Sequence, residues 1–163
     1  MKNTILRLTM LTGVAFVFTA CPYQSEVPIS EATEPVNEAI YGKWIAASDA
    51  EYDHPTFYSI SELDANHYEV VENSHYDKKY NKVEYIMHSS MVGDKMFMNV
   101  QEATGGNYHL HMIEIGVEGF TLWEVSSNID EKFDNSVDLH DFIEKYMDLS
   151  FFFTSDEKRY IKK

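Results

Sequence analysis

The chain has 163 residues, with 13 basic side chains, 27 acidic ones and a net charge of −14 at pH 7. An apolar fraction of 44% with 11 Tyr, 10 Phe and 2 Trp excludes a disordered tail and suits one domain. The charge argues against nucleic acid as a partner, because little here could neutralise phosphates. The single cysteine excludes a disulfide framework and a cysteine-rich zinc module.

The N-terminus reads as an export signal over residues 1–20. Lys2 and Arg7 precede an apolar stretch from Leu8 to Ala20, which Cys21 ends. As a helix this stretch rises about 20 Å, too short for a hydrocarbon core of about 30 Å. It therefore predicts a cleaved signal peptide in place of a membrane span.

The residues Phe18-Thr19-Ala20-Cys21 resemble a bacterial lipobox. The resemblance implies diacylglycerol on the Cys21 sulfur and cleavage before it. The protein would then be anchored by its lipid in the bacterial cell envelope, at the outer membrane on its periplasmic or surface face. The alternative is an ordinary signal peptide that ends near a cysteine.

Residues 21–39 form a proline-containing acidic segment. Pro22, Pro28 and Pro35 lie here with four glutamates, and neither Lys nor Arg occurs. This composition predicts an unpacked tether that holds the folded part off the membrane. Cleavage would also leave 11 basic residues against 27 acidic ones, a net charge of −16.

Residues 40–163 are predicted to form a mainly β domain. Aromatic and β-branched runs recur every 8–12 residues, which favours an antiparallel meander or a small barrel of about 8–9 strands. The predicted strands are 41–47, 56–63, 67–72, 83–91, 95–102, 108–115, 119–125, 151–154 and 159–161, with a polar loop over 73–82.

A two-residue turn at Gly93-Asp94 predicts the register of one hairpin. Paired residue numbers then sum to 187, so that Met91 faces Met96 and Met87 faces Val100. Alternation places one set of side chains on a shared apolar face, which we extend to the following strands as a candidate ligand pocket. Its members are Tyr85, Met87, Met91, Met96, Met98, Leu110 and Met112, continued by Phe120 and Leu122.

One segment has helical periodicity. Between Asn135 and Met147 apolar side chains follow the i, i+3, i+4, i+7 pattern, with Asn135 or Ser136 as the cap. We expect one late amphipathic helix that covers an end or a face of the sheet.

The triplet Gly42-Lys43-Trp44 resembles the G-x-W signature of lipocalins and related calycin barrels. In that superfamily the tryptophan plugs one end of the barrel, and a late arginine often stacks over it. Arg159 is the candidate for this cation–π contact in the present chain. The resemblance implies a ligand-binding barrel, with the late helix as a departure from the usual order.

Metal binding is the weaker interpretation of two groups of side chains. His109 and His111 point the same way on one strand, and His88 could join them, but we expect the pair to face solvent. Met96, Met98 and Met112 could bind copper(I), yet they fill a β-core equally well. We therefore expect no cofactor.

No catalytic motif is present in the sequence. G-x-S-x-G and a phosphate-binding glycine loop are both absent, so the chain is not expected to be an enzyme. Two functions remain. The first is a membrane-anchored barrel that binds a small apolar or amphipathic molecule. The second is an accessory lipoprotein with a filled core, whose acidic surface meets an envelope protein.

Overall fold

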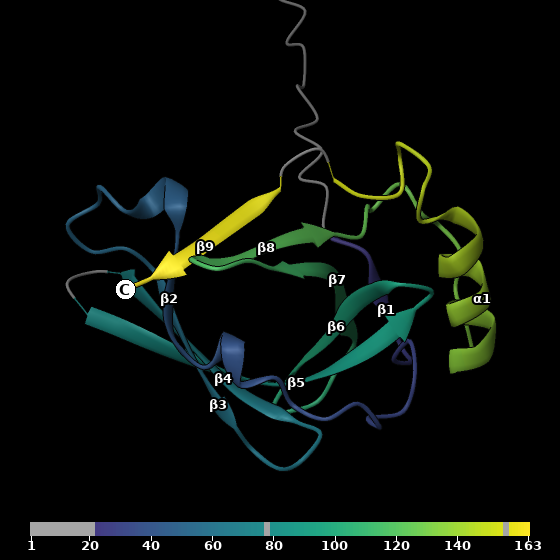
Figure 1. Cartoon of the computed structure of the whole chain (residues 1–163), viewed down its shortest axis with the longest axis horizontal. Coiled ribbons are helices and arrows are strands. Elements are labelled where there is room, and N and C mark those ends of the chain that lie inside the picture. Colours follow the sequence, from purple (N-terminus) through teal and green to yellow (C-terminus); the bar gives the residue numbers. More distant parts are fainter. Residues whose placement is uncertain (1–21, 77–78, 155–156) are drawn as a thin grey trace, which may run out of the picture.

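The computed structural model describes residues 22–76, 79–154 and 157–163. Nine strands form a single antiparallel sheet in the order β1-β7-β6-β5-β4-β3-β2-β9-β8, and an additional pairing of β7 with β8 closes it. Eight of these strands make the barrel, and β1 pairs with the first two residues of β7, beyond the end of the β7–β8 pairing. The predicted mainly β barrel with one late helix is confirmed (Figure 1).

The barrel strands and helices have the following bounds: β1 Gln24–Ser25, η1 Glu38–Ile40, β2 Gly42–Ala46, η2 Ala47–Asp49, β3 Phe57–Glu62, β4 Tyr68–Tyr76, β5 Lys79–Val92, β6 Lys95–Glu102, β7 Tyr108–Ile115, β8 Gly119–Glu124, α1 Ser136–Tyr146 and β9 Lys158–Lys162.

Two predicted elements are wrong. The polar stretch 73–82 is mostly strand, because β4 and β5 continue as one long hairpin in which His75 pairs with Tyr80. Residues 151–154 form no strand, and only an isolated bridge joins Phe153 to Val125. In both places the structure depends on backbone pairing between strands, and the pattern of apolar residues along the sequence does not reveal that pairing.

The barrel wall separates two hydrophobic cores. The barrel core lies inside and comprises Ile40, Trp44, Ile60, Tyr68, Val70, Met87, Met98, Ile113, Phe120 and Tyr160. The outer core comprises Tyr23, Ile29, Val92, Phe97, Leu110, Met112, Val125, Ile129, Leu139, Ile143, Met147 and Phe152. Side chains that alternate along β5 to β7 therefore supply both cores.

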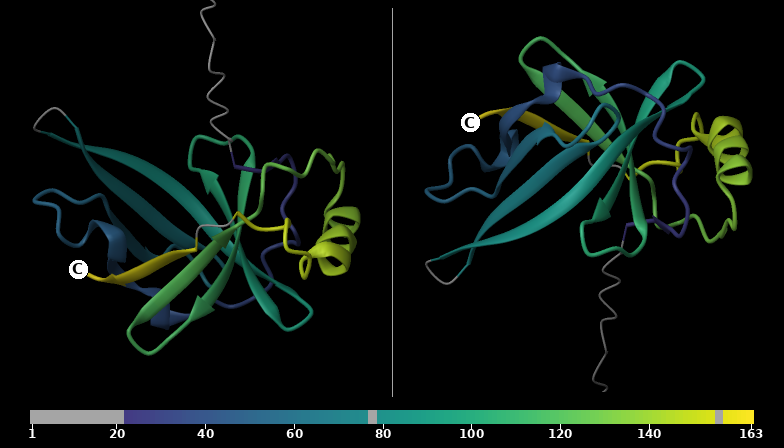
Figure 2. Two further views of the ribbon diagram at one scale, coloured as in Figure 1. Left: turned by 90° about the horizontal axis from the view of Figure 1, so that it is seen from above. Right: turned by 90° about the horizontal axis from the view of Figure 1, so that it is seen from below.

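Helix α1 covers the outer core. The Asn135 side chain caps it by accepting from the Asp138 amide at 2.9 Å, as predicted. Leu139 and Ile143 face the barrel and are almost fully buried. Figure 2 shows α1 outside the barrel wall in both views, beside the end of the β5–β6 hairpin.

The N-terminal segment also packs on the outer core, so the prediction of an unpacked tether is wrong for residues 22–39. Its strand β1 pairs with β7, and Ile29 is almost fully buried. The Ile29 amide donates to the Asn99 side-chain oxygen at 2.7 Å, and Ser30 Oγ lies 2.6 Å from Ser90 Oγ. Apolar residues placed among the glutamates provide this packing. We refer to residues 22–36 as the strap.

Gly119 lies where the pairing of β8 with β9 helps to close the barrel. It begins β8 opposite β9, and an added Cβ would overlap the Tyr160 carbonyl oxygen. At Gly116 the nearest atom would lie 3.5 Å away, which is ordinary contact. We expect Gly119→Ala to lower the free energy of unfolding by about 1–3 kcal/mol or more, as overpacking does, and Gly116→Ala to have a much smaller effect. Urea unfolding followed by tryptophan fluorescence measures both, and equal stabilities would contradict this closure.

Candidate functional site

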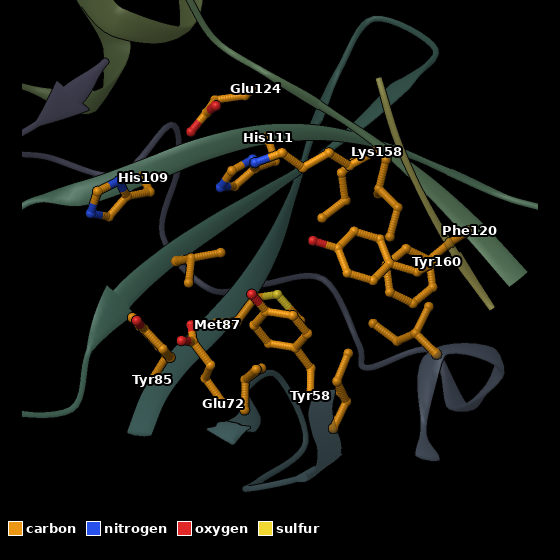
Figure 3. Close-up of a pocket in the computed structure, with 16 residues that line it drawn as sticks. Tyr58, Glu72, Tyr85, Met87, His109, His111, Phe120, Glu124, Lys158 and Tyr160 are labelled. Carbon is orange, nitrogen blue, oxygen red and sulfur yellow. The ribbon is translucent and has the colours of Figure 1, made fainter. Parts of the chain in front are cut away.

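The barrel contains a cavity of about 240 Å³ (Figure 3). Half of the 16 residues that line it have apolar side chains, and the other half have side chains with polar atoms. The apolar lining residues are Ile40, Ile60, Val70, Met87, Val100, Ile113, Phe120 and Leu122. The polar ones are Tyr58, Glu72, Tyr85, His109, His111, Glu124, Lys158 and Tyr160.

The cavity is closed at the end where η1 enters the barrel. Trp44 is 2% exposed there, and its indole N–H donates to the Ile40 carbonyl at 2.8 Å. Its ring meets Phe120 edge to face, with centroids 4.9 Å apart. Trp44 thus fills one end of the barrel, the position that the lipocalin resemblance implies for it, and Gly42 precedes it with a positive φ of 129°.

Arg159 does not stack over this tryptophan, so the predicted pair is wrong. Because Tyr160 points into the barrel, its neighbour Arg159 points outward, where it lies 3.5 Å from Glu118. Lys162 pairs with Trp44 across β2 and β9 and places its amine 5.3 Å from the indole ring centroid. A lysine therefore makes the cation–π contact.

The register predicted for β5 and β6 is confirmed, with Met87 opposite Val100 and Met91 opposite Met96. Tyr85 and Met87 line the cavity. Met98 belongs to the barrel core, and Met96 packs against it without reaching the cavity. Met91 is 37% exposed near the end of its strand and does not line the cavity.

The extension of this face to Leu110 and Met112 is wrong. In the observed register Met98 pairs with His111 and Val100 with His109. Leu110 and Met112 consequently point to the outer core. A shift of the pairing by one residue exchanges the two faces of a strand. The sequence of the connection between β6 and β7 does not determine which of the two registers forms.

The same register places His109 and His111 inside the cavity, so the expectation that they face solvent is wrong. His88 cannot join them, because it lies under the strap with Nε2 3.0 Å from the Ser30 carbonyl oxygen. Across the described ranges the only group of three converging metal ligands lies elsewhere. The copper set is also divided, since Met112 lies on the opposite side of the wall from Met96 and Met98.

The polar side chains cluster away from Phe120, the ring that Trp44 contacts, at the end of the cavity that we call the mouth: Glu72, Tyr85, His109, Glu124 and Lys158. All of them are partly or fully exposed. His111 lies directly opposite Glu124 across β7 and β8, and Lys158 lies opposite Leu122. Figure 3 shows the imidazoles and the Glu124 carboxylate along one side and Glu72 and Tyr85 along the other.

Burial changes the ionisation of several of these groups. It lowers the pKa of His111 to about 4, and nearby His109 and Lys158 add to this effect. Burial also raises the pKa of Tyr160 to about 12 and raises the pKa values of Tyr58 and Tyr85. At neutral pH these three phenols and the His111 imidazole are uncharged, and they can donate and accept hydrogen bonds in the cavity.

Sequence reasoning missed the polar residues Tyr58, Glu72, Glu124, Lys158 and Tyr160. Strand alternation could have identified three of them. Tyr68, Val70 and Glu72 alternate on one strand, so the face that carries the first two must also carry the glutamate. Tyr58 alternates in the same way with Ile60, and Glu124 with Leu122. Lys158 and Tyr160 depend on the pairing of β8 with β9, which joins segments separated by α1.

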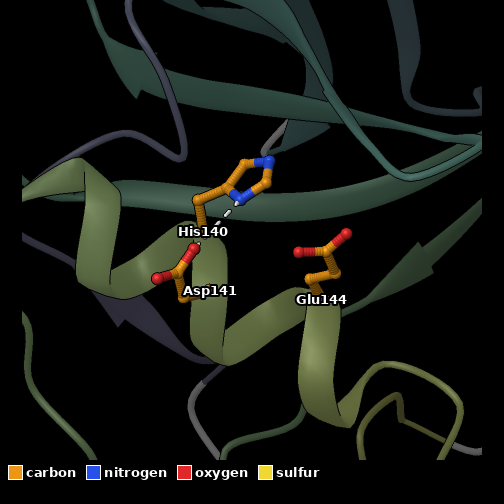
Figure 4. Close-up of side chains that lie close together, drawn as sticks. All are labelled: His140, Asp141 and Glu144. Carbon is orange, nitrogen blue, oxygen red and sulfur yellow. Dashed lines mark ion pairs between the residues drawn. The ribbon is translucent and has the colours of Figure 1, made fainter.

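A second group of titratable side chains lies on α1 (Figure 4). His140, Asp141 and Glu144 bring one possible ligand atom each within 4.8 Å of one another. His140 Nε2 lies 3.2 Å from the Met91 carbonyl oxygen and links α1 to β5, while both carboxylates are exposed. Exposed acidic side chains often gather in this way on one helix face, and we assign no ion to them.

Cys21, the predicted lipid attachment point, lies outside the described residues. In the part of the chain that the structure describes, no helix has both the length and the apolar character needed to cross a membrane.

No protein-family model, curated protein or solved structure matches this chain.

The depressed pKa of His111 predicts a pH dependence of stability. Between pH 6.5 and about 4 the unfolded chain binds a proton that folded His111 refuses, so stability falls as the pH falls through this range. His111→Gln removes this contribution. We expect its stability to change less between pH 7 and pH 4.5 than that of the wild type, by roughly 1–3 kcal/mol. Urea midpoints of both proteins at the two pH values test this. Equal changes in the wild type and the variant would show that the pKa of His111 is not lowered by burial.

Proposed function

We propose that this protein is a membrane-anchored envelope lipoprotein whose barrel binds a small apolar or amphipathic molecule. The observation that carries the proposal is the cavity, which has an apolar interior and a polar mouth. A ligand of this class would place its apolar part against Ile113, Phe120 and Leu122. Its polar part would meet the hydrogen-bonding groups of the mouth.

The size of the cavity supports a small ligand. An apolar protein cavity of about 150 Å³ can hold benzene, so about 240 Å³ suits a somewhat larger body or one part of an extended molecule. Three tyrosines border this space, with Tyr58 and Tyr160 meeting edge to face at 5.7 Å. Such rings offer apolar faces and hydroxyl donors in the same site.

Anchoring rests on the sequence. A short apolar leader that ends in the lone Cys21 supports lipid attachment in a bacterial envelope, and two or more acyl chains hold a protein far more firmly than one.

The alternative function, an accessory lipoprotein with a filled interior, is supported by the net charge of −14. The cavity favours the ligand-binding proposal over it, because a filled barrel would leave no such space.

Filling the cavity tests ligand binding. Val100 lines it between Met87 and His109, so Val100→Phe would occupy part of the space. The matched control is Val117→Phe, at a fully exposed position in the turn between β7 and β8. Both are made in a chain that begins at residue 21 with Cys21→Ser, which retains every described residue.

We expect the apolar fluorophore 1-N-phenylnaphthylamine to bind the parent chain and the control with similar Kd values. Val100→Phe should weaken binding by about tenfold or more, equivalent to about 1.4 kcal/mol. Circular dichroism verifies that each variant folds. A parent chain that binds no such probe, or a folded Val100→Phe variant that binds it unchanged, would contradict the proposed site.

A further inference from the structure

The turns and connections of the barrel divide between its two ends. The connections over 47–56 and 103–107 lie at the mouth, because they adjoin the ends of β2, β6 and β7 that carry Ala46, Glu102 and Tyr108. The turns over 63–67 and 116–118 lie at the closed end, beyond Glu62 and Ile115. Antiparallel neighbours alternate their connections in this way.

The strap begins at the mouth. In β1, Gln24 pairs with His109, whose side chain lines the cavity, and Ser25 pairs with Tyr108. From there the strap runs along the outside of the wall to the closed end, where the Val36 amide donates to the Ala65 carbonyl oxygen at 3.0 Å. Its first described residues lie beside His109 and the end of β8, where the Tyr23 amide donates to the Val125 carbonyl at 3.4 Å, next to Glu124 of the mouth.

Several buried contacts hold the strap in this position. Tyr23 is 8% exposed, and its hydroxyl donates to the Glu131 carbonyl at 3.1 Å. Ile29 is inserted in the outer core and is hydrogen-bonded to Asn99, which is itself fully buried. The chain between the anchor and the barrel thus has little slack, in contrast to a free tether.

Chain length then limits where Cys21 can be. Two residues lie between it and Gln24, and an extended chain spans at most about 11 Å over these three residue steps. The Gln24–His109 pair adds about 5 Å. The closed end lies much farther away, since eight-residue strands such as β7 extend about 26 Å. The attachment point can therefore lie no more than about 11 Å from Gln24, whose partner His109 belongs to the mouth.

We propose that the mouth of the cavity faces the membrane to which Cys21 is attached, and that the ligand is an amphipathic molecule that partitions into that membrane. This inference rests on the proposed function, both its lipid anchor and its binding cavity. A ligand could then pass from the lipid surface into the barrel with little exposure to water, its apolar part entering first.

Exposed aromatic side chains at the mouth agree with this orientation. Tyr52, in the connection between η2 and β3, is 66% exposed, and Tyr80, near the tip of the β4–β5 hairpin, is 43% exposed. Tyrosine is favoured at membrane–water interfaces, where its ring and its hydroxyl meet different surroundings. Asp49, Glu51 and Asp53 flank Tyr52, so a zwitterionic lipid surface is the appropriate one for a test.

Fluorescence quenching can determine the orientation. The predicted mature chain has no free thiol once Cys21 is acylated, so an introduced cysteine is the sole labelling site. Thr104→Cys places a label in the exposed turn at the mouth, and Val117→Cys places one in the exposed turn at the closed end. Each full chain, processed and acylated in cells, is labelled with bimane and reconstituted into phosphatidylcholine vesicles that carry a nitroxide on the head group.

We expect a loss of fluorescence from the label at position 104 and little from the label at position 117. Equal quenching of the two labels, or stronger quenching at position 117, would overturn the orientation. A Cys21→Ser chain that stays bound to membranes would also overturn it, because the anchor would then lie elsewhere. Neither result affects probe binding by the anchor-free chain, so a failure of the cavity itself is detected separately with Val100→Phe.

Discussion

The pairing register between β6 and β7 determines the chemistry of both sides of the barrel wall. With Met98 opposite His111, the odd-numbered residues of β7 point inward and the even-numbered ones outward. A shift by one residue would exchange them, placing Leu110 and Met112 inside and two histidines against α1. The cavity would then lose the His109 and His111 imidazoles, and the outer core would contain buried imidazoles without hydrogen-bond partners.

The outer surface of the same barrel wall carries the outer core. Because Leu110 and Met112 point outward, they provide an apolar surface that α1 and the strap can cover. The strap in turn satisfies polar groups that would otherwise be buried alone, since Asn99 accepts from the Ile29 amide and donates to Ser90. The strap, the cavity and α1 therefore all contact the same sheet, and the N-terminal segment is part of the fold.

Much of this architecture could be predicted from the sequence, and the failures have physical reasons. The Gly93-Asp94 turn fixed one register because a two-residue loop leaves no alternative. The five residues 103–107 allow either parity, so the orientation of His109 and His111 remained undetermined. Lys162 replaced Arg159 beside Trp44 because strand alternation, together with the inward position of Tyr160, turned the arginine away. The strap was missed because its composition is acidic, although isolated apolar residues such as Ile29 anchor it.

The most direct test of this account is the side of the wall on which the methionine methyl groups lie. Nuclear Overhauser contacts in a methyl-labelled sample would measure it in solution. We predict that the Met87 and Met98 methyls show contacts to the barrel core around Ile113, while the Met112 methyl shows contacts to the outer core around Leu139 and Ile143. Contacts from Met112 to the barrel core, together with histidine ring contacts to α1, would contradict the register and the cavity that depends on it.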